Sequence, residues 1–480
     1  GYLTEKVKFM KLDKFYINGE WVPPSEDETI DIINPSDEAV IGTLNVGSEA
    51  DIDRAVEAAK SAFSNYAQTS VAERLDLLKE ILNQFEKRFE DFVEAITTEM
   101  GAPVKLSRAA QAAVGMNHLK TAIRVLAEHK FEYPFNGYIV RQEPIGVCGL
   151  ITPWNWPINQ TISKLGPCLA SGCTAVLKPS EISPLSANII AEIMDAAKVP
   201  KGVFNMVHGL GPVVGEALSN HKDVDMMSFT GSTRGGVAVA QAAAKTVKRV
   251  SQELGGKSPN IIFDDEKFEQ SVTIGVQKIM ENTGQSCNAP TRMIVPKSRQ
   301  DEALEIAKNV SEKLITGDPT KEETDIGPLV SQTQFDKVQR LIDSGIKAGA
   351  QLVTGGLGKP IGVNAGYFVK PTVFGDVDNS MDIAQEEIFG PVLSVIPYDD
   401  MDHAVQIAND TSYGLSAYVC GSDLEKLKSV ARQIRAGQIH VNYGSGGTNA
   451  PFGGFKQSGN GREKAEWGLE EFLETKAIME

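Results

Sequence analysis

The sequence IGVCGLITPWNWPINQTISKLGPCLASGCTAVLK, residues 145–178, places two short apolar segments on either side of a longer one. The outer segments, 145–151 and 174–178, have the length and apolar character of buried strands. The middle segment, around 160–170, is long enough to form a helix. A strand, a helix and a second strand in this order predict two parallel strands joined by a covering helix.

The same alternation continues through most of the chain. Further strands are expected at 203–207, 225–230, 247–254, 259–263 and 291–296. Helices are expected at 186–197, 235–245, 271–283 and 301–314, with another helix beginning within 211–218. The second run of alternating segments continues to about residue 450. This pattern is typical of an α/β protein built on parallel sheets.

The N-terminal part of the chain follows a different pattern. Residues 15–22 are expected to form a strand, and Asp51 is expected to cap the helix that follows it. A long helical pattern covers about 71–100 and ends before a glycine and a proline. Residues 131–147 predict two strands that turn at 134–137.

The composition is that of an ordinary soluble globular enzyme. The 480 residues are 41% hydrophobic and 23% charged, which allows a large core and about three domains. The net charge of −16 comes without a basic stripe, so no nucleic-acid partner is expected. The longest apolar run, near 145–151, is too short to cross a bilayer, so no membrane association is expected.

The cysteines and the N-terminus favour an intracellular protein. The five cysteines form no C-x-x-C pair and the six histidines are isolated, so neither a disulfide scaffold nor a metal site is expected. The opening GYLTEKVKF lacks the apolar core of a signal peptide, which favours the cytoplasm. Met10 leads into KLDKFYINGEWV, so residues 1–9 are expected to be a cloning remnant or to belong to an alternative start.

Ligands of parallel α/β sheets bind beyond the carboxyl ends of the strands. Two predicted strands end in a glycine-rich loop that leads into a helix: HGLGPVVG, which contains Gly211 and Gly215, and FTGSTRGG, which contains Gly231 and Ser232. Such loops let a phosphate approach the backbone, and helix N-terminal amides attract anions. Glycine is also common in these turns for steric reasons, and neither loop fits G-x-G-x-x-G. On the loops alone, phosphate binding and simple turn formation remain alternatives.

Several side chains outside these loops could carry chemistry. Cys287, in NTGQSCNAPTR, is either a small buried hydrophobe or a nucleophile. Glu253 follows a predicted strand and is either a surface carboxylate or a general base. Asn155 lies between two tryptophans, where its amide either makes structural hydrogen bonds or stabilises an oxyanion. Lys178 and Glu181, in LKPSE, either form a surface pair or hold a ribose.

Eight ordered motifs resemble those of the NAD(P)-dependent aldehyde dehydrogenase superfamily. They are ITPWNWP, LKPSE, FTGST, ELGGKSPN, GQSCNAPTR, GYFVKPTVF, QEEIFGPV and PFGGFKQSGNGRE, and they extend along nearly the whole chain. The resemblance implies two doubly wound parallel-sheet (Rossmann-like) domains and a small β domain for oligomerisation. The NAD-binding domain would comprise 10–125 and 146–255, and the catalytic domain 256–450. Residues 126–145 and 451–480 would bridge subunits in a homodimer or homotetramer.

The resemblance also implies a hydrolytic, non-acylating mechanism that converts a small-molecule aldehyde into a carboxylic acid. Cys287 falls on the family's nucleophile position and would attack the aldehyde as a thiolate, giving a thiohemiacetal. The Asn155 amide and the Cys287 backbone N–H would hold the oxyanion. Hydride transfer to the nicotinamide would leave a thioester, and Glu253 would activate the water that hydrolyses it.

Cofactor residues carry over from the same motifs. Lys178 and Glu181 match contacts to the adenosine ribose, and Ser232 matches a pyrophosphate contact at a helix start. A carboxylate at the ribose 2′-hydroxyl repels a 2′-phosphate, which favours NAD as the cofactor. NADP remains the alternative, because Lys178 would soften that repulsion.

The nicotinamide end of the cofactor has its own matching residues. Glu387 and Phe389, in QEEIFGP, match the pair that positions the nicotinamide ribose and ring. Ile151 and Trp154, in ITPWNWP, are expected to line the same cleft. The resemblance therefore implies a cofactor that runs from the loop after 178 to the loop that carries Phe389.

Three features depart from the family pattern. Arg234 and Gly235 stand where relatives usually have an acidic or other residue followed by an aliphatic one. The loop 441–454, VNYGSGGTNAPFGG, is glycine-rich where many relatives supply an aromatic side chain to the substrate pocket. Ser163 occupies a position that is often bulkier. The last two features predict a roomier or more mobile substrate entrance.

Two other functions remain as alternatives. An acylating dehydrogenase would pass the thioester to coenzyme A, but such relatives typically lack the base that Glu253 supplies. A catalytically silent member would serve as a binding protein, but it would be expected to lose part of the set Cys287, Glu253, Asn155 and Glu387. The substrate class stays open among aliphatic, aromatic and amino aldehydes such as betaine aldehyde.

Overall fold

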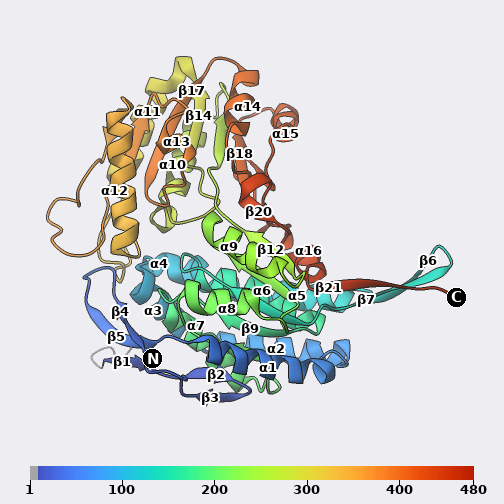
Figure 1. The fold of residues 1–480 in the computed structure, drawn as a ribbon. Coiled ribbons are helices and arrows are strands. Elements are labelled where there is room, and N and C mark those ends of the chain that lie inside the picture. The colour runs from blue at the N-terminus through green and yellow to red at the C-terminus, as the bar shows by residue number, and fades with distance from the viewer. Residues whose placement is uncertain (1–8) are drawn as a thin grey trace.

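The computed structural model describes residues 9–480, so the expectation for residues 1–9 lies, apart from Phe9, outside the described residues. Figure 1 shows two α/β bodies stacked one above the other and an arm of strands that extends to one side. The blue-to-green part of the chain forms most of the lower body, and the yellow-to-red part forms most of the upper body. The α/β class predicted from the sequence is confirmed.

The lower body is built on an eight-stranded sheet with the order β20-β12-β11-β8-β9-β10-β2-β3. The five strands from β12 to β10 are parallel, whereas β20, β2 and β3 are antiparallel to their neighbours. The strands are β2 (Phe15–Ile17), β3 (Glu20–Val22), β8 (Val147–Ile151), β9 (Thr174–Lys178), β10 (Phe204–Met206), β11 (Met226–Thr230), β12 (Arg249–Glu253) and β20 (Gly459–Asn460). The parallel strands are buried on both faces, which explains their unbroken apolar runs.

Helices cover both faces of this sheet. Val147 and Ile151 of β8 belong to one apolar cluster, and Cys148 and Leu150 belong to another, as the alternation of side chains along a strand requires. The first cluster includes α1 (Glu49–Tyr66), α8 (Glu216–Asn220) and α9 (Thr233–Ala244), preceded by η2 (Gly211–Gly215). The second includes α2 (Val71–Lys87), α3 (Phe89–Met100), α5 (Ala113–Glu128), α6 (Pro157–Ser171) and α7 (Pro184–Ala196), with α4 (Val104–Leu106) and η1 (Ser107–Gln111) leading into α5.

The upper body repeats this plan with a seven-stranded sheet in the order β15-β16-β17-β14-β13-β18-β19. All its strands are parallel except β15. The strands are β13 (Pro259–Ile262), β14 (Arg292–Pro296), β15 (Gln351–Thr354), β16 (Thr372–Gly375), β17 (Val392–Tyr398), β18 (Ser416–Cys420) and β19 (Gln438–Val441). This sheet is also covered on both faces, because neighbouring residues such as Ile261 and Ile262 pack into different apolar clusters.

The helices of the upper body divide between those two clusters. One face holds α10 (Phe268–Met280) and α11 (Gln300–Lys313). The other holds α12 (Gln332–Lys347), α13 (Asp382–Gln385), α14 (Met401–Asn409) and α15 (Leu424–Ala431). Short turns complete the chain: η3 (Glu281–Gly284), η4 (Lys297–Arg299), η5 (Gly447–Asn449), η6 (Lys456–Ser458) and α16 (Ala465–Glu470).

Two small sheets lie outside these bodies. The arm in Figure 1 consists of β6 (Glu132–Phe135), β7 (Tyr138–Pro144) and β21 (Leu473–Ile478), in the order β21-β7-β6. The predicted hairpin is confirmed, and it turns at Asn136 and Gly137, whose positive φ values of 47° and 86° suit a two-residue hairpin turn. The other sheet, in the order β1-β5-β4, contains β1 (Met10–Leu12), β4 (Thr29–Ile33) and β5 (Val40–Asn45).

Some predicted boundaries were wrong. The first long helix begins at Glu49 with Ser48 as its cap, and Asp51 lies in the first turn, where its carboxylate accepts from the Ser48 backbone N–H. This reciprocal arrangement places an acidic residue three positions inside the helix, not at its cap. The pattern over 71–100 is two helices, α2 and α3, separated at Arg88.

Candidate active site

A cleft of about 140 Å³ lies at the carboxyl ends of the parallel strands in the lower sheet, facing the upper body. Its lining residues come from the loop after β8, helix α6, the end of β11 and the loop after it, the end of β12 and the loop after it, the loop after η3, helix α12 and the loop after α13. Eight of the predicted site residues meet there: Trp154, Asn155, Gly231, Ser232, Glu253, Cys287, Glu387 and Phe389. Segments that are up to 235 positions apart in the sequence, from Trp154 to Phe389, therefore form one site.

Cys287 is positioned by a strained turn. Asn282 and Thr283 have φ values of 55° and 58°, a left-handed conformation that is unusual for a β-branched residue such as Thr283. Gly284 follows with φ 72°, and a Cβ there would lie 1.9 Å from the Gly390 carbonyl oxygen. This close approach brings the turn against the loop that carries Phe389, and it sets the direction in which Cys287 enters the cleft.

Buried amide groups hold this turn against the Asn155 loop. The Asn282 side-chain amide donates to the backbone oxygens of Asn155 and Gln285, both at 3.1 Å. The Gln111 amide donates to the Asn155 oxygen at 2.9 Å and to the Asn282 side chain at 3.0 Å. Gln111 ends the π-helical segment η1, an irregularity that frequently occurs at functional sites. The sequence analysis missed Gln111 and Asn282.

Asn155 is 3% exposed, and its side-chain amide donates to the Gln285 backbone oxygen at 3.2 Å. That bond and the two that Asn155 accepts on its backbone fix the amide beside the Cys287 loop. Preorganised amides of this kind stabilise developing oxyanions without reorganisation during the reaction. The geometry is compatible with both functions considered for Asn155, structural and electrostatic.

Glu253 ends β12 and is 2% exposed, and neither of its carboxyl oxygens has a hydrogen-bond partner among residues 9–480. Burial and the nearby carboxylate of Glu463 raise the pKa of Glu253 well above its usual value. A solvent-poor carboxyl group with a raised pKa is typical of a general acid or base. The structure thus removes the alternative of a surface carboxylate.

A buried ion pair lies next to Glu253. The Lys164 ammonium is 3.2 Å from the Glu463 carboxylate and donates to the Ser228 hydroxyl at 2.8 Å. The Ser163 hydroxyl donates to the same carboxylate at 3.1 Å. The small size of Ser163 led us to expect a roomier substrate entrance. In the structure Ser163 does not line the cleft; its hydroxyl instead helps to hold the Glu463 carboxylate. Lys164 and Glu463 also escaped the sequence analysis, because they are 299 positions apart.

The Cys287 thiol is only partly exposed to the cleft. Burial, together with the charges of Glu387 and Glu253, raises the pKa of the Cys287 thiol to about 12, while Lys464 acts in the opposite direction. At neutral pH the thiol is consequently protonated in this arrangement. A nucleophilic role requires a base to take its proton when substrate binds.

Glu387 and Phe389 form the opposite wall. Glu387 accepts from the Gly256 backbone N–H at 2.8 Å, and burial raises its pKa to about 7. The Phe389 ring meets the Trp154 ring edge-to-face, with a centroid separation of 5.6 Å. Gln334 and Lys337 of α12 line the same wall, and the sequence analysis did not identify them.

The other predicted cofactor residues lie outside this cleft. Lys178 ends β9 and its ammonium is 3.3 Å from the Glu181 carboxylate. Ile151 ends β8, and a Cβ on Gly215 would be 3.6 Å from its side chain. A Cβ on Gly211 would meet nothing within 4 Å, so the backbone there borders open space. These residues lie at the carboxyl ends of β8 and β9 or in segments that follow the parallel strands of the same sheet.

A second cavity, of about 510 Å³, lies on another side of the Cys287 loop. It is bounded by α5, by Asn288, which follows Cys287, and by the glycine-rich loop that was expected to shape the substrate entrance. Its lining residues are Val114, Asn117, Lys120, Thr121, Asn288, Gln438, His440, Ser445, Gly446, Gly447, Thr448, Asn449, Phe452 and Lys464. We call it the entrance cavity.

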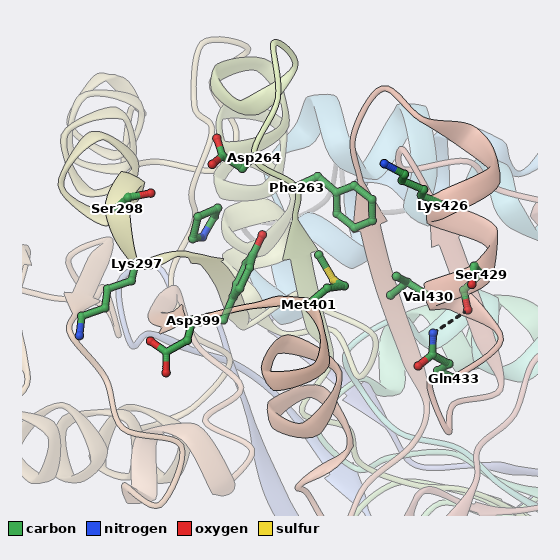
Figure 2. A pocket seen from close by; sticks show the side chains of 12 residues that line it. Phe263, Asp264, Lys297, Ser298, Asp399, Met401, Lys426, Ser429, Val430 and Gln433 are labelled. Carbon is green, nitrogen blue, oxygen red and sulfur yellow. Dashed lines mark hydrogen bonds between the residues drawn. The ribbon is translucent and has the colours of Figure 1, made fainter.

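A larger cavity, of about 840 Å³, contains none of the predicted site residues. Figure 2 shows its lining side chains, among them Phe263, Lys297, Asp399 and Lys426, which follow β13, β14 and β17 or belong to α15. It thus lies at the carboxyl ends of the upper sheet, whereas Cys287 precedes β14 and lies at the amino ends. The candidate cleft therefore lies where ligands of parallel sheets usually bind with respect to the lower sheet, but not with respect to the upper sheet.

Among residues 9–480, no group of three or more His, Cys, Asp or Glu side chains could hold a metal ion. Within the same range, no helix has both the length and the apolar character needed to span a membrane.

Two parallel-sheet bodies that enclose a cleft with a cysteine, a buried carboxyl group and a fixed amide define an α/β enzyme. The chain belongs to the aldehyde dehydrogenase family, whose model matches residues 21–478. Members of this family are oxidoreductases that convert aldehydes into carboxylic acids with NAD(P).

Named relatives support this assignment. A 3-succinoylsemialdehyde-pyridine dehydrogenase from a Pseudomonas species is 51% identical over 467 residues, 97% of this chain and 98% of its own length. The structure is similar to aldehyde dehydrogenase C of Pseudomonas syringae, solved as a cysteine-to-alanine variant with NAD+ and octanal, with a TM-score of 0.96 and 50% identity over 97% and 96% of the two chains. It is also similar to betaine aldehyde dehydrogenase of Staphylococcus aureus in complex with NAD+, with a TM-score of 0.94 and 35% identity over 97% and 94% of the two chains.

Proposed function

We propose that this protein oxidises an aldehyde to a carboxylic acid with NAD, through a thioester on Cys287 that water hydrolyses. The observation that supports this most is the meeting of Cys287, Glu253 and Asn155 in one cleft with Glu387 and Phe389. In this proposal the Cys287 sulfur attacks the aldehyde carbon and its proton passes to a base. The Asn155 amide and the Cys287 backbone N–H hold the oxygen that becomes negative.

The residues present fit a dinucleotide. Glu181 and Glu387 offer carboxylates to ribose hydroxyls at two positions along the strand ends, and the open backbone at Gly211 leaves room for a phosphate. Gln334 Oε1, in the wall of the cleft, is buried without a hydrogen-bond partner among the described residues and can accept from such a hydroxyl. When bound, NAD accepts the hydride that leaves the substrate carbon. Phe389 and Trp154 would hold the nicotinamide ring in the cleft and exclude water from it.

Glu253 releases the acid in this proposal. Its carboxylate would take a proton from the water that attacks the thioester, and the sulfur of Cys287 would leave. Because burial and the Glu463 carboxylate raise the pKa of Glu253, its basic form is gained at a higher pH than in an exposed glutamate. The ion pair of Lys164 and Glu463 lies beside it and tunes this pKa.

Substitution of Glu463 tests that tuning. In Glu463→Gln the negative charge that raises the Glu253 pKa is removed, and the Lys164 charge that lowers it stays. We expect the ascending limb of deacylation rate against pH to move to lower pH, by about one unit. The measurement is the pH profile of single-turnover thioester hydrolysis. Glu466→Gln is the control, since Glu466 pairs with Arg124 at the surface; an unmoved limb in Glu463→Gln would contradict the account.

Glu181 is the residue that we expect to select NAD over NADP. Its carboxylate, held near Lys178, would repel a 2′-phosphate. In Glu181→Ser the ratio of kcat/KM for NADP to that for NAD should rise about tenfold or more, because the repulsion is lost and the Lys178 charge remains. An unchanged ratio would place the discrimination elsewhere.

We also propose a division of the chain into domains and an oligomeric state. The NAD-binding domain would comprise 10–125 and 146–255, the catalytic domain 256–450, and the bridging segments 126–145 and 451–480. The arm of β6, β7 and β21 carries the exposed apolar side chains of Phe135 and Ile478, which supports a homodimer or homotetramer. We also propose the cytoplasm as its location, because the described cysteines are all free thiols.

Formation of NADH, followed by absorbance at 340 nm, tests the proposed function. The assay combines NAD with about a dozen aliphatic, aromatic and amino aldehydes, with and without coenzyme A, and quantifies the acid. We expect acid and NADH in equal amounts without coenzyme A. Strict dependence on coenzyme A would favour an acylating enzyme, and cofactor binding without turnover of any aldehyde would favour a silent member.

A further inference from the structure

The entrance cavity is lined by a lysine, Lys464, that has no ion pair among residues 9–480. Phe452 and Glu463 pair through two backbone hydrogen bonds, of 2.9 and 2.7 Å. The Glu463 side chain turns inward to Lys164, and the next side chain, that of Lys464, lines the cavity. Lys464 is partly buried and has a left-handed φ of 71°. This conformation is uncommon for a residue other than glycine.

The Lys464 ammonium lies 4.7 Å from the centre of the Phe452 ring. It has no ion pair or hydrogen bond to any other side chain in the described part of the chain. Burial lowers the pKa of Lys464, while the neighbouring acidic side chains of Glu463, Cys287 and Glu253 act in the opposite direction. The ammonium is thus held on the face of the Phe452 ring, in the wall of the entrance cavity. Partly desolvated charges are normally paired, so an anionic ligand would stabilise this one.

The charged residues that line the cavity also favour an anionic ligand. Its lining residues include two lysines, Lys120 and Lys464, and no aspartate or glutamate. His440 donates from Nδ1 to the Gly444 oxygen at 2.6 Å, and burial lowers its pKa, so its ring is neutral at pH 7. The lining is therefore cationic and rich in hydrogen-bond donors such as the Asn117 and Asn288 amides.

Hydrogen bonds hold the glycine-rich loop that forms one wall of the entrance cavity. The Thr121 and Thr448 hydroxyls share a hydrogen bond of 2.6 Å, and the Arg124 guanidinium donates to the Asn449 side chain at 2.9 Å. These bonds attach the glycine-rich loop to α5. These contacts give this part of the cavity wall a defined position.

Together with the proposed function, on which it rests, this geometry leads to a substrate class. We propose that the preferred substrate is an aldehyde with a carboxylate at the far end of its chain, and that the Lys464 ammonium binds that carboxylate. Lys464 is then a specificity-determining residue. Cationic aldehydes such as betaine aldehyde are disfavoured by the two lysines and the lack of a carboxylate in the lining.

Matched aldehydes test this proposal. We compare kcat/KM for succinate semialdehyde with that for butanal, and adipate semialdehyde with hexanal, with 4-(trimethylammonio)butanal as the cationic member. The wild type should prefer the acid at one or both lengths by about tenfold to a hundredfold, the range of a charged hydrogen bond. The cationic aldehyde should be the poorest substrate.

Variants assign the preference to Lys464. Lys464→Met should reduce the acid-to-alkanal ratio at least tenfold, and Lys464→Arg should keep most of it. The ratio is the readout because loss of this charge also raises the Cys287 pKa and lowers turnover of every aldehyde. Lys278→Met removes a cation that lies over Tyr443 and does not line the cavity, so it should leave the ratio unchanged.

The outcomes separate the two proposals. No oxidation of any aldehyde would overturn the proposed function itself. Good oxidation of alkanals without preference for the acids, or a preference that survives in Lys464→Met, would overturn this inference alone. If Lys464→Met does not fold, inhibition of the wild type by glutarate and by pentanoate decides, since the dicarboxylate should inhibit at a concentration at least tenfold lower.

Discussion

Replacement of Cys287 by alanine should abolish aldehyde oxidation while leaving NAD binding intact. The sulfur atom forms the bond to substrate in this account, and no other described cysteine lines the cleft. Without it neither the thiohemiacetal nor the thioester can form, so the expected loss of kcat is about 10⁴-fold or more, to the limit of detection. The measurements are NADH formation at 340 nm and calorimetric titration with NAD.

The retained cofactor affinity is what separates a chemical defect from misfolding. NAD is expected to contact Trp154, Glu181 and Glu387, none of which changes in Cys287→Ala. Cys168→Ala, in the buried core of α6, is the matched control and should remain active. Acid production by Cys287→Ala would reject the assignment of the nucleophile.

Replacement of Glu253 by glutamine should give one rapid turnover and then a stall. Hydride transfer precedes the step that needs this base, so the first NADH should form in an amount equal to the sites. Glutamine has nearly the same shape but cannot take a proton from water, and the steady-state rate should fall about 10²–10⁴-fold. Stopped-flow absorbance at 340 nm resolves the two phases.

The substitution is well suited to the site. The Glu253 side chain is buried without a hydrogen-bond partner among the described residues, and its raised pKa means that the site disfavours the charged form, so neutral glutamine should fit. The control is Glu281→Gln, which changes a carboxyl group in the turn before Cys287 that does not line the cleft. It should show normal steady-state turnover. A normal steady state in Glu253→Gln would mean that another group serves as the base, and the lack of a burst would place Glu253 before hydride transfer.

The sequence predicted the parallel strands well because burial on both faces leaves a continuous apolar run. The strands at 145–151, 174–178 and 291–296 contain β8, β9 and β14, and the helices between strands were found by their length. The ends of helices were predicted less accurately where a residue could be interpreted in two ways or where no residue marked the end. Asp51 looked like a cap, yet Ser48 three residues earlier holds that position. The break at Arg88 has neither glycine nor proline to mark it.

The candidate site was predicted in part, and the reason is the distance along the chain. Residues in short motifs, such as Cys287 and Glu253, could be identified from their immediate neighbours. The sequence could not identify Gln111, Lys164 and Glu463 in this way, because each contacts a segment more than 40 positions away. The location of Cys287 at the amino ends of the upper sheet also has no local signal, since it depends on how the two bodies face each other.

The central claim is that the substrate becomes a thioester on Cys287 that Glu253 helps to release. Acid quenching of Glu253→Gln during the burst, followed by peptide mapping by mass spectrometry, tests it most directly. The account predicts one acyl group per subunit, on the peptide that contains Cys287, in an amount equal to the NADH formed. NADH formation without an acylated peptide, or an acyl group on any of the other four cysteines, would contradict it.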